Sequence, residues 1–333
     1  YMKYSLIIPV YNRPDEVDEL LASLEVQTLK DFEVVVVEDG STIPCQNVVN
    51  EHASRLALRY FHKENSGPGQ SRNYGAERSQ GEYLIVLDSD CVLPPGYLQA
   101  VDDELNRKPC DAFGGPDRAH ESFSPVQKAI NYSMTSFFTT GGIRGGKKKL
   151  DKFYPRSFNM GIRADLYRRL GGFSAMRFGE DIDFSIRIFK SGASCRLFPE
   201  AWVWHKRRTD MKKFFKQVHN SGIARINLQK RHPGSMKLVH LLPAVFTAGM
   251  ACLALLCLAG LVLAGANLYG IHGASGTGTD DHMLHVGVLI GCIAMACSLV
   301  PPVLYSILIF SDSLIQNRSC KVALLSIKAS FIQ

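Results

Sequence analysis

The stretch "GEYLIVLDSDCVLPPGYL", residues 81–98, places the first constraint on the fold. Its apolar run, residues 84–87, is typical of a strand buried on both faces of a sheet. Two carboxylates, Asp88 and Asp90, follow directly where this run ends. A charge at the edge of an apolar core is unfavourable unless another group compensates it, so these aspartates need a partner.

The sequence around this stretch alternates between strand-like and helix-like segments. Apolar runs that predict buried strands occupy residues 4–10, 32–39, 56–62 and 82–88. Helical spacing or helix-opening residues mark segments 15–27, 45–54 and 70–79. This alternation predicts an α/β fold, a parallel sheet with helices covering both faces. Ligands of such sheets bind at the carboxyl ends of the strands.

Polar residues stand at those strand ends. The first predicted strand is followed by Tyr11 and Asn12, and the second ends in Glu38 and Asp39. Two common nucleotide-binding loops are excluded. The segment "GPGQSR" has Arg72 where the dinucleotide fingerprint requires its third glycine. The segment "GGIRGGKK", residues 141–148, lacks both the Ser or Thr of a P-loop and a preceding strand.

Asp88 and Asp90 are two residues apart, so their side chains point to the same side of an extended chain. Two close carboxylates repel each other unless a cation lies between them. Mg²⁺ or Mn²⁺, itself bound to phosphate oxygens, would supply that cation. A simple turn at the strand end explains the same two residues equally well, so this pattern alone leaves both interpretations open.

The C-terminal third has the composition of a membrane region. Residues 238–265 and 283–310 contain no Asp, Glu, Lys or Arg. Each exceeds the roughly 20 residues that span a bilayer, although a pair of buried core helices is the alternative. Pro301 and Pro302 predict either a kink or a re-entrant segment within the second run. Residues 322–333 are a third membrane segment or part of one.

The formal net charge of the 333-residue chain is +7, and ten Lys or Arg lie between Lys206 and Lys237. The loop between the two apolar runs carries no Lys or Arg, whereas both flanks do. By the positive-inside rule, the N-terminal domain is cytoplasmic and the basic block faces membrane lipid rather than nucleic acid. The nine scattered cysteines form no CxxC pair and fit a reducing compartment.

Five segments, in order, resemble the family 2 glycosyltransferases, which have the GT-A (Rossmann-like) nucleotide-sugar fold. They are "SLIIPVYNRPDEVDELLASLEVQT", "FEVVVVEDGS", "GPGQSRNYGAERSQGEYLIVLDSDCVLPPGYL", "FNMGIRADLYRRLGGF" and "GEDIDFSIRI". The resemblance covers the chain from Tyr4 to about Lys237. It implies a GT-A domain at residues 1–230, followed at 231–333 by a juxtamembrane segment and two or three membrane helices.

The resemblance also implies a set of site residues. The nucleoside would be bound by Pro9, Tyr11, Asn12, Glu38 and Asp39. Glu38 stands where the family usually has Asp, which leaves the base undecided, although uridine is the family's commonest choice.

The diphosphate and metal half of the site would use Arg72, Asp88, Asp90 and His205. Asp90 would be the direct metal ligand, Asp88 would hold the ribose or a metal-bound water, and His205 would reach the metal or diphosphate. Arg72 as a surface arginine and His205 as an interfacial residue are the alternatives.

On the acceptor side, Asp181 would be the general base and Glu180 would orient the acceptor or Asp181. A cap at a helix start is the alternative for this acid pair, and Asp183 is a less favoured base.

These residues predict a membrane-anchored, metal-dependent, inverting glycosyltransferase of the hexosyltransferase type. It would use Mn²⁺ or Mg²⁺, a UDP-sugar donor and a lipid-linked or cell-surface glycan acceptor at the cytoplasmic face of a bacterial inner membrane. A processive polysaccharide synthase is one alternative, although Asn220 and Ser221 replace the Arg-Trp that such enzymes carry after Gln217. A non-catalytic nucleotide-sugar-binding protein is another. The loop 141–149 would close over the donor, contact anionic lipid or be disordered.

Overall fold

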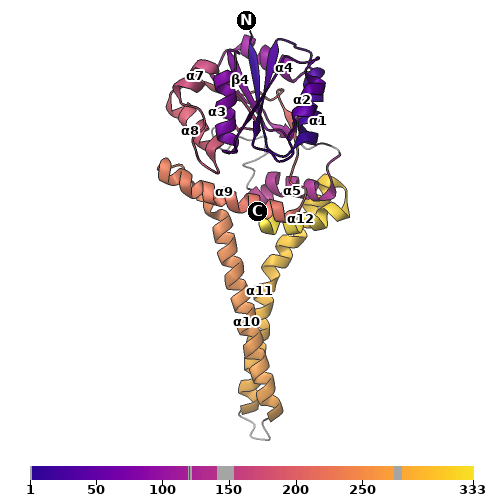
Figure 1. Cartoon of the computed structure of the whole chain (residues 1–333). Helices are drawn as coiled ribbons and strands as arrows, with labels where there is room; N and C mark the ends of the chain where they lie inside the picture. The colour runs from indigo at the N-terminus through magenta and orange to yellow at the C-terminus, as the bar shows by residue number, and fades with distance from the viewer. Residues whose placement is uncertain (1, 119, 121, 141–153, 274–279) are drawn as a thin grey trace.

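The computed structural model describes residues 2–118, 120, 122–140, 154–273 and 280–333. Figure 1 shows three parts: an α/β domain, a layer of helices below it, and a hairpin of two long helices. The predicted loop 141–149 lies outside the described residues.

The α/β domain is built on a seven-stranded sheet with the order β3-β2-β1-β4-β8-β6-β9. Its strands are β1 (Tyr4–Val10), β2 (Phe32–Asp39), β3 (Leu58–Lys63), β4 (Tyr83–Leu87), β6 (Ala112–Gly114), β8 (Asn159–Arg163) and β9 (Cys195–Leu197). The first four are parallel, as the sequence predicted. The prediction of a wholly parallel sheet is wrong beyond β4, because β8 runs antiparallel to both β4 and β6.

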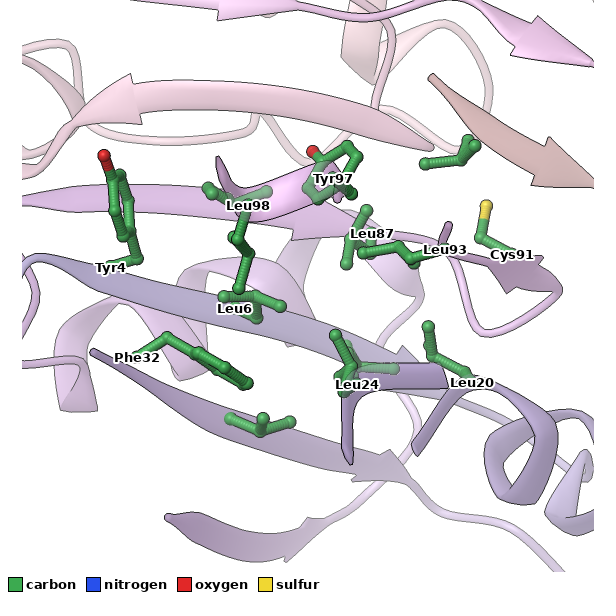
Figure 2. Close-up of a cluster of buried hydrophobic side chains, with 14 of the residues drawn as sticks. Tyr4, Leu6, Leu20, Leu24, Phe32, Leu87, Cys91, Leu93, Tyr97 and Leu98 are labelled. Atoms are coloured by element: carbon green, nitrogen blue, oxygen red, sulfur yellow. The ribbon is translucent and has the colours of Figure 1, made fainter. Parts of the chain in front are cut away.

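Helices cover both faces of this sheet (Figure 1). They are α1 (Pro14–Glu25), α2 (Gln46–His52), α3 (Pro68–Arg78), α4 (Tyr97–Arg107), α7 (Ala164–Arg169) and α8 (Glu180–Lys190). Because side chains alternate along a strand, β1 contributes to two cores. Leu6 packs with Leu20, Leu24 and Leu98 in the core under α1, α2 and α4, shown in Figure 2. Ile7 points to the core under α3, α7 and α8.

A small second sheet extends the strand-end side of the domain. It consists of β5 (Cys91–Val92), β10 (Val203–His205) and β7 (Asp117–Arg118) in the order β5-β10-β7. The antiparallel pairing of β10 with β5 places His205 opposite Cys91. A residue more than a hundred positions away in sequence is thereby held beside Asp90.

The helical layer consists of α5 (Pro125–Thr135), α6 (Phe137–Thr140), α9 (Met211–Arg231) and α12 (Cys320–Ile332). Ile130, Met134, Phe214 and Ala329 form an apolar cluster that joins α5, α9 and α12. Tyr132 donates a 2.5 Å hydrogen bond from α5 to Asp312 Oδ2 of the adjoining long helix. Residues 322–332 of the segment expected as a third membrane helix lie in α12, a 13-residue helix of this layer, and a membrane location for it stays a prediction.

The short helix η1 (Leu238–Leu241) leads into the hairpin of α10 (Leu242–Gly273) and α11 (Asp280–Asn317). Segments Leu242–Leu268 and His285–Asn317 are long and apolar enough to cross a membrane. Only 6 % and 11 % of their most apolar windows are buried within the chain, which is unlike the core helices of a soluble protein. Pro301 and Pro302 lie inside α11, which continues through them, so the described helix has no re-entrant break there.

Candidate active site

A cleft of about 1030 Å³ opens where β1, β2 and β4 end. Nine of the residues predicted from the sequence line it, namely Pro9, Tyr11, Asp39, Arg72, Asp88, Asp90, Glu180, Asp181 and His205. They come from strand ends, from two helix starts and from the small sheet. The fold thus brings together groups separated by up to about 200 positions of sequence. Asn12 and Glu38 do not line the cleft.

Arg72 joins the two sides of the cleft. Its Nη2 donates to Asp88 Oδ1 at 2.7 Å and its Nη1 to Glu180 Oε1 at 3.1 Å. The residue is only 3 % exposed, which excludes the alternative that it is a surface arginine. Its Nε is buried without a hydrogen-bond partner in the described part of the chain. The guanidinium compensates the charge of Asp88 and keeps one donor free for a ligand.

The Asp39 side chain binds the loop that precedes α3. Its carboxylate accepts hydrogen bonds from the backbone N–H of Ser66 and Gly67, both at 2.9 Å, and an ion pair from Lys63. Burial opposes its ionisation, but Lys63 and these N–H donors more than offset burial and lower the pKa of Asp39. Asp39 is therefore a fixed negative charge at the β2 side of the cleft.

Glu38 and Asn12 form hydrogen bonds that hold the loop 41–45 in place. The buried Glu38 accepts a 2.7 Å hydrogen bond from the backbone N–H of Cys45 and pairs with Ser41. Asn12, at φ 55°, accepts hydrogen bonds from the N–H of Thr42 at 2.8 Å and of Ile43 at 3.0 Å. Their direct contact with a nucleoside stays a prediction, because the structure shows them holding a loop.

Asp90 and His205 form the clearest metal-binding arrangement. His205 Nε2 lies 3.2 Å from Asp90 Oδ1 and Arg13 Nη1 lies 3.8 Å from Asp90 Oδ2. Burial raises the pKa of Asp90 and the neighbouring His205 lowers it, to about 2. Asp90 Oδ1 and His205 Nδ1 are buried without hydrogen-bond partners in the described part of the chain. A carboxylate and an imidazole with unused ligand atoms fit Mn²⁺ well.

Cys91 completes the group of potential ligands, because ligand atoms of Asp90, Cys91 and His205 lie within 4.8 Å of one another. Burial raises the pKa of the Cys91 thiol well above its ordinary value. The sulfur lies 3.5 Å from the carbonyl oxygen of Phe158, to which the thiol donates. A neutral thiol is a poor ligand for a hard divalent cation, so Asp90 and His205 are the better pair.

Glu180 and Asp181 open helix α8, directly after Gly179 at φ 84°. Asp181 Oδ2 accepts a 2.7 Å hydrogen bond from Arg156 Nε, and Oδ1 accepts one of 2.8 Å from the N–H of Ile182. Burial raises the pKa of Asp181, but Arg156 more than offsets this and the pKa is lowered. Burial raises the pKa of Glu180. Asp181 is thus the more acidic member of the pair, and its carboxylate retains lone pairs beyond these two bonds.

Asp183, the less favoured base, is enclosed by two arginines and a histidine. It is 0 % exposed and does not line the cleft. Arg187 Nε at 2.9 Å, Arg231 Nε at 2.9 Å and His232 Nε2 at 2.8 Å surround its carboxylate. Asp183 therefore connects α8 to the C-terminal end of α9.

Several basic residues of the cleft were not found from the sequence: Arg13, Arg156, Arg177, Arg208, Lys213, Lys216 and Arg225. Arg13 lies within the first segment that carries the family resemblance, in "YNRPD", and Arg156 lies two residues before the segment that begins "FNMG". Those on α9 belong to the basic block, which the sequence assigned to the membrane surface alone. No local signal distinguishes Arg225 from its neighbours.

The family model described as Glycosyl transferase family 2 matches residues 5–171. The chain belongs to this family. An uncharacterised glycosyltransferase of Rickettsia felis is 42 % identical over 137 residues, which is 41 % of this chain and 22 % of that protein. The chain thus spans about a fifth of the length of this family 2 relative.

Solved structures share the GT-A fold of this family 2 chain. The mannosyltransferase PcManGT of Pyrobaculum calidifontis, in complex with GDP-Man and Mn²⁺, matches 99 % of the chain and 87 % of its own, at TM-score 0.57 and 15 % identity. TarS 1-349 of S. aureus, in complex with UDP-GlcNAc, matches 72 % of the chain and 69 % of its own, at TM-score 0.50 and 20 % identity. At these identities the likeness establishes the fold alone.

Proposed function

We propose that the protein is a membrane-anchored, metal-dependent, inverting glycosyltransferase. It transfers a sugar from a nucleotide-sugar donor to a lipid-linked or cell-surface glycan acceptor. The observation that carries this proposal is the convergence of Asp39, Asp88, Asp90, Asp181 and His205 on one cleft at the strand ends. Family membership and the GT-A fold agree with it.

The donor would lie across the ends of β1, β2 and β4. Tyr11 and Asp39 line the part of the cleft proposed to hold the nucleoside, and Arg72 would direct its free Nε toward the diphosphate. We propose a UDP-sugar. The structural neighbours carry UDP-GlcNAc in one case and GDP-Man in the other, so GDP-sugars are the second set to test.

Asp90 and His205 would hold Mn²⁺ or Mg²⁺, with Asp88 near the ribose or a metal-bound water. The ion would stabilise the negative charge on the departing nucleoside diphosphate. Arg13, whose Nη1 lies 3.8 Å from Asp90 Oδ2, adds a fixed positive charge to the same side.

Asp181 would remove the proton from the acceptor hydroxyl as that oxygen attacks the anomeric carbon. Its lowered pKa keeps it ionised at neutral pH, which a general base requires. Glu180, held by Arg72, would orient the acceptor or Asp181. A single displacement of this kind inverts the anomeric centre.

The membrane placement follows from α10 and α11, and the catalytic domain would face the cytoplasm. The basic block before α10 and Arg318 and Lys321 after α11 lie at the same end of the hairpin, and the positive-inside rule assigns that end to the cytoplasm.

We further propose that the enzyme adds one or few sugars. Gln217, Asn220 and Ser221 line the cleft, so polar side chains occupy the positions where processive synthases carry an Arg-Trp pair. Product length on a defined acceptor tests this: a long polymer would contradict it.

The central experiment uses the full chain in a neutral detergent. With Mn²⁺ present, a UDP-sugar should raise the thermal midpoint, and slow transfer to water or acceptor should release the nucleoside diphosphate. Asp181→Asn should slow this release by about 10²–10⁴-fold. Glu77→Gln, an exposed carboxylate of α3, is the matched control. Release by Asp181→Asn at the wild-type rate would exclude Asp181 as the base. A protein that binds no nucleotide-sugar would contradict the whole proposal.

A further inference from the structure

One wall of the cleft is strongly basic. Helix α9 carries no Asp or Glu between Met211 and Arg231. Three of its cations, Lys213, Lys216 and Arg225, line the cleft together with Arg156 opposite them. The wall therefore adds positive charge to the cleft.

Arg225 lines the cleft without a direct ion-pair partner among the described residues. Its side chain is half-buried, and no hydrogen bond or ion pair joins it to another described side chain. Burial and repulsion by Arg156 lower the pKa of Arg225, and Asp181 opposes this only in part. Ala224 lies against Gly179, the residue before Glu180, so Arg225 is held near the start of α8, where Arg156 binds Asp181.

Arg156, not Arg225, forms the direct ion pair with Asp181. Its Nε donates to Asp181 Oδ2 at 2.7 Å, and this is its only ion pair in the described part of the chain. Glu180 and Asp117 also attract Arg156, but their own ion pairs are with Arg72 and Arg207, so Arg225 has no carboxylate bound directly to it among the described residues. A partly buried guanidinium without a bound anion is unfavourable, and an anion at this position would reduce the cost.

We propose that the acceptor carries an oxyanion, a phosphate or carboxylate, that binds between Arg156 and Arg225 beside Asp181. This inference rests on the proposed function and adds the chemical class of the acceptor. Guanidinium groups match such anions, because their planar N–H forks donate two parallel hydrogen bonds to phosphate or carboxylate oxygens.

The donor diphosphate does not account for this pair. The cations that act on Asp90 are His205, Arg13 and Arg208, whereas Arg156 and Arg225 both act on Asp181. Arg72 acts on both Asp88 and Asp181; apart from it, these cations fall into two groups, and we assign one group to each predicted substrate.

The position of α9 indicates where the oxyanion comes from. Figure 1 shows α9 lying across the upper end of the hairpin of α10 and α11. The same helix exposes Phe215, Ile223 and Ile226, apolar side chains suited to the bilayer surface. An acceptor anion attached to a lipid would reach Arg225 along this helix.

The experiment measures binding of dodecyl phosphate to the full chain in dodecyl maltoside, with dodecanol as the uncharged probe and inorganic phosphate as the soluble one. Arg225→Gln should weaken binding of dodecyl phosphate about tenfold or more, and Arg225→Lys should retain part of the affinity. Lys230→Gln, which removes an exposed charge of α9 outside the cleft, is the matched control.

Equal losses in Arg225→Gln and Lys230→Gln would overturn the proposal, because they would reflect the general charge of the helix. Equal binding of dodecyl phosphate and dodecanol would overturn it as well. Inorganic phosphate that binds as tightly as dodecyl phosphate, and only with Arg225 intact, would support the oxyanion site and assign it to a soluble acceptor. Mn²⁺-dependent binding of UDP or GDP, measured in parallel, tests the proposed function separately.

Discussion

Arg72 Nη2 lies 2.7 Å from Asp88 Oδ1, and the same guanidinium binds Glu180 at 3.1 Å. It therefore connects the end of β4 with the start of α8. Each carboxylate alone would be unfavourable at the edge of the core, and together they would repel. A buried arginine between them offsets both costs and fixes the distance between the donor side and the acceptor side of the cleft.

Replacement of Arg72 by Met should destabilise the α/β domain. Asp88 and Glu180 would lose their shared cation, at a cost of about 3 kcal/mol, the lower end expected for a broken buried pair since Asp88 is partly exposed. The thermal midpoint in detergent should fall by roughly 6–12 °C. Arg78→Met on the same helix, where the side chain is partly exposed, should cost far less. Equal effects of the two variants would contradict the bridging role of Arg72.

Local patterns predicted β1 to β4 and the helices between them, because alternating strands and helices leave a strong periodic signal. The D-x-D stretch, the acid pair at the start of α8 and His205 were predicted through the family resemblance, and the structure brings them to one cleft. Their roles in binding and catalysis stay predictions.

Other features depend on tertiary contacts that no local pattern encodes. Strand β8 pairs antiparallel to β4 across more than 70 residues, and its five residues give no indication of direction. Glu38 resembles a ligand-binding acid in sequence, but its carboxylate binds the N–H of Cys45. Arg156 stands in a segment without regular structure, and only the fold shows that it meets Asp181.

The ion pair between Arg156 and Asp181 predicts a change in pH dependence. A base must be ionised, so activity is lost as the pH falls through the pKa of Asp181, which Arg156 lowers. In Arg156→Gln, Asp181 stays buried but loses the neighbouring cation, so the pKa of Asp181 should rise. The acid limb of the pH–rate profile should then move to higher pH. The rate of nucleoside diphosphate release between pH 4 and 8 measures this. An acid limb at the wild-type position would show that Asp181 does not control it.

The ligand group predicts a selective response to metal. Asp90→Asn and His205→Gln should weaken Mn²⁺ binding, each by at least about tenfold, because each removes a buried ligand atom that has no hydrogen-bond partner in the described part of the chain. Cys91→Ala should retain the wild-type affinity, since burial keeps the thiol neutral and bonded to the carbonyl of Phe158. Calorimetric titration of the chelator-treated protein with Mn²⁺ distinguishes the three variants. A loss in Cys91→Ala comparable to that in Asp90→Asn would make the sulfur a ligand.

Gly115 and Gly222 should respond in opposite ways to an added methyl group. A Cβ at Gly115 would lie 1.7 Å from the carbonyl oxygen of Ala201 and 2.5 Å from Asn159 Nδ2, so the backbone beside β10 would have to move. Gly115→Ala should therefore cost about 2–3 kcal/mol and lower the thermal midpoint by roughly 4–12 °C. At Gly222, in the exposed interior of α9, a Cβ would meet no atom within 4 Å. Gly222→Ala should raise the free energy of unfolding by about 0.5–1 kcal/mol, because alanine favours the helix. A destabilised Gly222→Ala would show that α9 contacts another surface at this position.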